Sequence, residues 1–94
     1  MAELLSDAEI QEKAKSLEGW TVEGKELHTT RQFKDFVEAI AFVNKIVEPA
    51  EAAGHHPDLG ISYNKVTISL TTHDAGGLTA NDFEMAQTLS KLSA

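Results

Sequence analysis

The sequence predicts an α+β domain in which a four-stranded antiparallel sheet carries three helices on one face, in the order α-β-β-α-β-β-α. Two kinds of apolar spacing favour this class. Apolar residues recur every three to four positions in three segments, and they alternate in two segments that are each divided by a turn. Two hairpins, each followed by a helix, favour an antiparallel sheet with helices on one side. Because the chain has 94 residues, 41% of them hydrophobic, we expect a single domain over residues 1–94.

A capping box begins the first helix. Ser6 and Glu9 are spaced so that each side chain can bond the other residue's free backbone N–H. The buried stripe that follows is expected at Ile10, Ala14 and Leu17. Beyond Gly19 the apolar spacing changes to alternation on both sides of Gly24, which predicts a hairpin over about residues 20–33.

The second helix is predicted from Asp35 to about Ala53, because its apolar residues follow the helical period. Pro49 lies inside this segment. Its nitrogen cannot donate a hydrogen bond and its ring crowds the preceding turn, so we expect a kink or a break there. Gly54 suits the left-handed residue that ends a helix.

A second hairpin is predicted from alternation in residues 59–63 and 66–70, with Asn64-Lys65 as its turn and Asn64 as the residue that tolerates positive φ. Tyr63 is expected on the core side of its strand. Thr79 and Asp82 form a second capping box, which begins the last helix. The other face of the sheet is expected to be polar: Glu26, His28, Thr30, Ser62, Thr67, Ser69 and Thr71.

Charge and composition exclude several classes of function. The chain carries 8 basic and 15 acidic residues, a formal charge of −7, which argues against nucleic acid or a membrane surface as a partner. It has neither a signal-peptide pattern nor an apolar run of the roughly 20 residues that would span a bilayer, so we expect a cytoplasmic protein. Without cysteine, any chemistry must come from His, Asp, Glu, Ser, Thr or Tyr.

Three histidines are predicted to converge at one end of the second hairpin. With the turn at Asn64-Lys65, the register places His56 opposite His73, and His55 precedes His56 at the helix-to-strand junction. Opposed residues have Cβ atoms about 5 Å apart. Two imidazolium ions this close would repel, so one neutral and one charged ring are expected, which together supply a base and an acid.

Structural roles compete with this interpretation. A single histidine at a strand end is usually solvated or bonded to the backbone, and His28 keeps that interpretation, but three together favour a site. A three-histidine zinc site is the rival; because adjacent His55 and His56 point in different directions in an extended segment, we predict no metal. Glu51 opposes the helix dipole in the last turn of its helix, which favours a role in orienting a histidine. Asp82 already has a capping role, so a site role would be additional.

The spacing of these residues resembles the pterin-4a-carbinolamine dehydratase family. The matching positions are Glu51, His55-His56-Pro57 after three spacers, Tyr63, His73 and Asp82. Chain length, element order and the hairpin Tyr63-Asn64-Lys65-Val66 extend the resemblance over nearly the whole sequence. The family resemblance implies a hydro-lyase that converts 4a-hydroxytetrahydrobiopterin to quinonoid dihydropterin and water, in tetrahydrobiopterin recycling, without a cofactor.

The resemblance also implies roles for the residues. His55 and His73 would be the acid–base pair, and His56 would mainly hold the pterin. Glu51, Asp82 and Pro57 would orient this set or contact the substrate.

Two departures and one alternative accompany the resemblance. Many members that resemble this chain have an aromatic residue at the position of Leu59, where it could form a wall for the pterin ring, and Pro49 could displace Glu51 by rotating the helix end. The alternative function is a non-catalytic dimerisation or assembly module, similar to a transcriptional coactivator. A homodimer or homotetramer is expected under both functions, because pairing sheet edges satisfies backbone groups.

Overall fold

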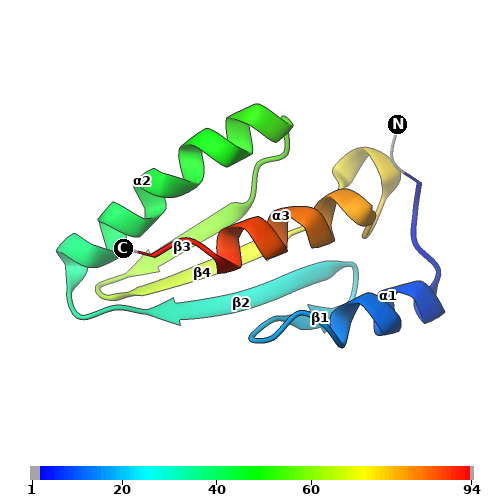
Figure 1. Cartoon of the computed structure of the whole chain (residues 1–94), viewed down its shortest axis with the longest axis horizontal. Coiled ribbons are helices and arrows are strands. Elements are labelled where there is room, and N and C mark those ends of the chain that lie inside the picture. The colour runs from blue at the N-terminus through cyan, green and yellow to red at the C-terminus, as the bar shows by residue number, and fades with distance from the viewer. Residues whose placement is uncertain (1–2, 94) are drawn as a thin grey trace.

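Four antiparallel strands form one sheet in the order β1-β2-β4-β3, and three α-helices pack on one of its faces (Figure 1). The structure is a computed structural model that describes residues 3–93. The α+β class and the predicted order of elements are confirmed. The elements are α1 (Asp7–Ala14), β1 (Thr21–Glu23), β2 (Glu26–Gln32), α2 (Phe36–Ala53), β3 (Asp58–Ser62), β4 (Lys65–Leu70), the 3₁₀ turn η1 (His73–Ala75) and α3 (Ala80–Ser90).

The three helices begin where their capping residues predict. Ser6 and Glu9 form the reciprocal capping box of α1, and the hydrogen bond from the Ser6 backbone, with that from its hydroxyl, holds the pKa of Glu9 below its usual range. Asp35 caps α2 by accepting a hydrogen bond of 2.9 Å from the Glu38 N–H. Thr79 and Asp82 form the capping box of α3.

Pro49 does not break α2, which is continuous from Phe36 to Ala53 (Figure 1). Of the predicted kink or break, the break is therefore wrong. The carbonyl that Pro49 leaves without its helical partner belongs to Lys45, an exposed residue, so water can take that hydrogen bond. Ile46 and Ala50, on either side of the proline, are buried against the core and hold the helix in place.

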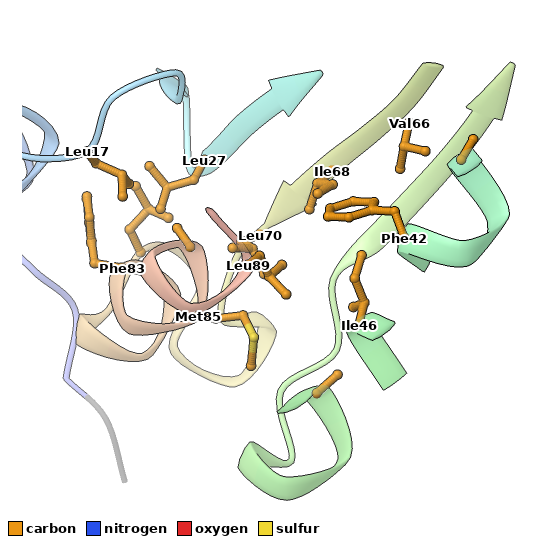
Figure 2. Packing of buried hydrophobic residues seen from close by; sticks show 14 residues of the cluster. Leu17, Leu27, Phe42, Ile46, Val66, Ile68, Leu70, Phe83, Met85 and Leu89 are labelled. Carbon is orange, nitrogen blue, oxygen red and sulfur yellow. The ribbon is translucent and has the colours of Figure 1, made fainter. Parts of the chain in front are cut away.

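The core lies between the sheet and the helices. In β4, Val66, Ile68 and Leu70 are buried, whereas Thr67 and Ser69 between them face the polar side of the sheet. Figure 2 shows Phe42 and Ile46 of α2 near the β4 residues. Helix α1 contributes partly buried side chains to the same cluster. Among the described residues, no helix is long and apolar enough to cross a membrane.

The turn of the second hairpin differs from the prediction. Ser62 pairs with Lys65, so the turn residues are Tyr63 and Asn64, and Tyr63, not Asn64, has positive φ (52°). Tyr63 is 65% exposed, so its predicted place on the core side is wrong. The Asn64 amide donates to the Phe33 carbonyl at 2.9 Å, and Asn64 O accepts from the Phe33 N–H at 2.8 Å. These contacts with the chain after β2 fix Asn64 in the turn, which local sequence could not reveal.

The corrected register also separates the predicted His56–His73 pair. The β3–β4 ladder ends at Asp58 opposite Ser69, before either histidine is reached. His73 lies beyond β4, as the first residue of η1. The two histidines are therefore not opposed in a ladder.

Candidate active site

The end of α2 sends His55 and His56 in different directions. Gly54 ends the helix in the left-handed conformation (φ 63°), and the His55 N–H donates to the Ala50 carbonyl at 3.1 Å. Beyond this point the His55 ring reaches Asp82 on α3, whereas the His56 ring turns back to Glu51 on α2. The divergence expected of adjacent residues in an extended segment is present, and each ring has its own carboxylate.

His55 and Asp82 form a largely buried pair. His55 Nε2 lies 2.6 Å from Asp82 Oδ1, and the two side chains are 14% and 0% exposed. Asp82 Oδ2 accepts the Thr79 N–H at 2.9 Å and the Thr72 hydroxyl at 2.8 Å. As a carboxylate, Asp82 can only accept hydrogen bonds, so a donor must face Oδ1 as well as Oδ2. His55 Nε2 therefore carries a hydrogen, and Nδ1 is the nitrogen left for proton transfer.

His56 and Glu51 form a similar but exposed pair. His56 Nε2 lies 2.6 Å from Glu51 Oε2, with side chains 61% and 69% exposed. Glu51 makes this contact from the same helix that contains Pro49. This contact orients the His56 ring through Nε2, but its exposure makes the pair worth little for stability.

His73 joins the other two histidines at one hollow. The hollow has a volume of about 220 Å³, and its lining residues are Gly54, His55, His56, Thr71, Thr72, His73 and Asp74. His73 reaches it from η1 and is exposed. The trio therefore converges, although by a turn after β4 and not by the predicted ladder.

Other predicted residues lie around this hollow and not in it. Pro57 and Leu59 line a neighbouring hollow between α2 and β3, which they share with His56 and Glu51. The position at Leu59 is therefore not part of the wall around the three histidines. Tyr63 lies in the hairpin turn at the opposite end of β3 (Figure 1).

Sequence reasoning missed three lining residues, Thr71, Thr72 and Asp74. Thr71 is expected from the sequence on the polar sheet face, and Asp74 lies outside the predicted set of site residues. Thr72 carries no spacing signal, and only its position next to His73 could have drawn attention to it. His28 keeps its structural role on the polar face, where its Nε2 lies 2.8 Å from the Ser69 hydroxyl.

The groups around this hollow can support proton transfer. Neutral imidazole can accept a proton and imidazolium can donate one near neutral pH, and these rings surround a space open to a small molecule. Within residues 3–93, no three His, Asp or Glu side chains are grouped so that they could hold a metal ion.

Comparison with known proteins finds a matching family model and similar sequences. Residues 3–92 match the family model described as pterin 4 alpha carbinolamine dehydratase. A protein of Trichormus variabilis named "Putative pterin-4-alpha-carbinolamine dehydratase" is 69% identical over 99% of this chain and 100% of its own length. A protein of Nostoc punctiforme with the same name is 68% identical over 98% of this chain and 99% of its own.

Solved structures share the fold. A crystal structure of a transcriptional coactivator/pterin dehydratase from Brucella melitensis has a TM-score of 0.90 and 33% identity, covering 96% of this chain and 98% of its own. A pterin dehydratase-like protein described as a RuBisCO assembly factor in the alpha-carboxysome has a TM-score of 0.65 over 77% of this chain and 86% of its own. At 21% identity, the second likeness is one of fold alone.

Proposed function

We propose, because this chain belongs to the pterin 4 alpha carbinolamine dehydratase family, that it is a hydro-lyase acting on 4a-hydroxytetrahydrobiopterin. The products are quinonoid dihydropterin and water. We place this step in the cytoplasm, in the recycling of tetrahydrobiopterin. The observation that carries the proposal is the hollow at which three imidazoles meet, two of them held by carboxylates at 2.6 Å.

The reaction needs one base and one acid. The base removes the proton from N5, and the electron pair of that N–H bond becomes the second bond between N5 and C4a. The bond from C4a to the hydroxyl oxygen breaks, and the acid protonates the departing oxygen to give water. One proton leaves the substrate and one returns, so a neutral and a charged imidazole meet the whole requirement.

The residues divide by their contacts. His55 and His73 are assigned to proton transfer, and Asp82 orients His55 through Nε2 so that Nδ1 is available. His56 is assigned mainly to holding the pterin, with Glu51 fixing its ring. Pro57 contributes to substrate binding indirectly, because it sets the direction of the chain from His56 into β3.

A dehydration assay on histidine variants tests the proposal. His55→Ala and His73→Ala should each lower kcat by roughly 10²- to 10⁴-fold, the usual range for an acid–base group. His28→Ala is the matched control, because His28 lies on the polar sheet face and outside the hollow. Parental rates in both site variants, with folding intact, would eliminate the catalytic assignment.

Self-association accompanies the proposed activity. All five residues of the edge strand β3 are exposed, including Leu59 at 39% and Ile61 at 44%. On α2, Val37 and Val47 are 75% and 57% exposed. An open sheet edge next to apolar side chains favours a second copy as partner. We therefore propose a homodimer or a homotetramer.

A non-catalytic assembly role is the second candidate. It is supported by the same exposed apolar residues and by the descriptions of the two solved relatives, one as a coactivator and one as an assembly factor. The histidine variants separate the two functions. An assembly module would lose no partner binding in His55→Ala or His73→Ala.

A further inference from the structure

Thr72 begins the turn that carries His73, but its hydroxyl does not cap that turn. It is the N-cap residue of η1, where threonine ordinarily accepts a hydrogen bond from a backbone N–H two or three residues later. Here no such bond is made. The hydroxyl instead reaches across to α3 and donates to Asp82 Oδ2 at 2.8 Å. A local capping function therefore does not account for this side chain.

The hydrogen bonds around Thr72 have a single direction. Because the Thr72 hydroxyl donates to Asp82, the Thr79 hydroxyl, 2.8 Å away, must donate to Thr72. The Thr79 oxygen in turn accepts the Asn81 N–H at 3.3 Å. In this series of hydrogen bonds, each hydroxyl donates in the direction of the Asp82 carboxylate. The other oxygen of that carboxylate, Oδ1, lies 2.6 Å from His55 Nε2. His55 Nε2–H is therefore the donor to Asp82 Oδ1.

The backbone of Thr72 holds the His73 turn. Its carbonyl accepts the N–H groups of Ala75 at 3.1 Å and Gly76 at 3.0 Å, and its N–H donates to the Gly77 carbonyl at 3.0 Å. Thr72 and Gly77 form an isolated antiparallel bridge that closes the segment carrying His73. Thr72 also lines the hollow together with His55 and His73. Thr72 thus forms hydrogen bonds both with Asp82, the partner of His55, and within the turn that carries His73.

We propose that Thr72 is a positioning residue that couples the two proton-transfer histidines. Its hydroxyl orients Asp82 and so fixes the ring and tautomer of His55, while its backbone holds the turn from which His73 enters the hollow. This inference rests on the proposed dehydratase function. Thr72 itself transfers no proton to the substrate.

Removing the hydroxyl tests the first half of the coupling. Thr72→Val keeps the β-branched shape and should lower kcat by roughly 10- to 100-fold, the range that corresponds to one hydrogen bond to a charged group. Thr72→Ser keeps the hydroxyl and should recover most of the rate. The matched control is Thr67→Val on β4, whose side chain faces the polar side of the sheet and lies outside the hollow.

A double-mutant cycle and an NMR measurement separate positioning from general damage. If Thr72 acts through Asp82, Thr72→Val combined with Asp82→Asn should lose no more than Asp82→Asn alone. The His55 Nε2 proton should give a downfield resonance that is lost in His55→Ala. This resonance should move in Thr72→Val and stay in place in Thr67→Val.

The outcomes distinguish this inference from the proposed function. Parental rates in His55→Ala and His73→Ala would refute the function, while the NMR measurement would still test the positioning. If those variants lose activity but folded Thr72→Val keeps the parental rate and the parental His55 resonance, the inference is overturned. If Thr72→Val does not fold, Thr72→Ser serves as the test. Loss of the His55 resonance in Thr72→Ser, which retains the hydroxyl, would contradict the inference that this hydroxyl positions His55.

Discussion

Asp82 closes the capping box of α3 and, with its other oxygen, lies 2.6 Å from His55 Nε2. The capping role alone is common, and Glu9 performs it at the start of α1 without touching a histidine. What distinguishes Asp82 is its complete burial, 0% exposed, with both oxygens bonded. A helix start is thereby used to fix an imidazole at the edge of the hollow.

The substitution Asp82→Asn should distinguish the role of the Asp82–His55 contact from the role of Asp82 as a helix cap. The amide has the same shape, but its NH₂ group must face either His55 Nε2–H or the donors Thr72 and Thr79, so one contact fails or the His55 tautomer changes. We expect kcat to fall at least tenfold and the free energy of unfolding to fall by about 1–3 kcal/mol. The dehydration assay and urea denaturation measure the two effects. A folded Asp82→Asn protein with parental kcat would refute the orienting role.

Acidification should remove the contribution of the α1 capping box. The pKa of Glu9 is lowered in the folded protein, chiefly by the hydrogen bond from the Ser6 backbone, so its stabilisation is present above the unfolded pKa and is lost as pH falls through the folded one. The difference in unfolding free energy between the parent and Glu9→Gln should therefore change over that acidic range and be constant above it. Urea denaturation at a series of pH values measures it. A difference that is constant throughout would contradict this linkage.

The Glu51–His56 pair should affect substrate binding more than stability. Because both side chains are mostly exposed, Glu51→Gln should change the unfolding free energy by less than about 1 kcal/mol. It frees the His56 ring, so KM should rise several-fold with a smaller change in kcat. Glu48→Gln, at an exposed position earlier on α2, is the control and should change neither constant. A fall in kcat as large as that of His55→Ala would place Glu51 in the proton transfer itself.

Sequence patterns predicted the elements well, because each depends on neighbouring residues. The capping boxes at Ser6 and Thr79 and the left-handed Gly54 are local features, and all three were found. The turn was misplaced because Asn64 is held by Phe33, a partner outside the hairpin. The register moved by two residues, but the ladder ends before either histidine. The three histidines still meet at one hollow because η1, after β4, carries His73 to the end of α2 where His55 and His56 lie.

The partners of the histidines were less accessible to sequence reasoning. Contacts across the fold, such as that from Thr72 to Asp82, leave no periodic signal, since they depend on how η1 and α3 pack. Spacing could identify which residues gather at one end of the hairpin. It could not show which carboxylate each ring contacts.

Replacing Pro49 with alanine should stabilise the protein. The helix is continuous through this position, so Pro49→Ala restores an N–H that can donate to the Lys45 carbonyl and removes the clash of the ring. Greater freedom of the unfolded chain offsets part of the gain, and we expect a net increase of about 1–2 kcal/mol in the free energy of unfolding. Urea denaturation measures it, with Glu48→Ala as the control for the added alanine. An unchanged or lower midpoint in Pro49→Ala would show that α2 is adapted to its proline.

A charge on the apolar side of β3 should weaken self-association. Ile61 is 44% exposed on the edge strand, and a second copy that pairs with this edge would bury it. Ile61→Lys would place an ammonium group in that interface, so the dissociation constant measured by analytical ultracentrifugation should rise at least tenfold, about 1.4 kcal/mol. Thr67→Lys adds the same charge on the polar face of the neighbouring strand and should leave association unchanged. If the parent is monomeric across the micromolar range, or if both variants weaken association equally, β3 is not the interface.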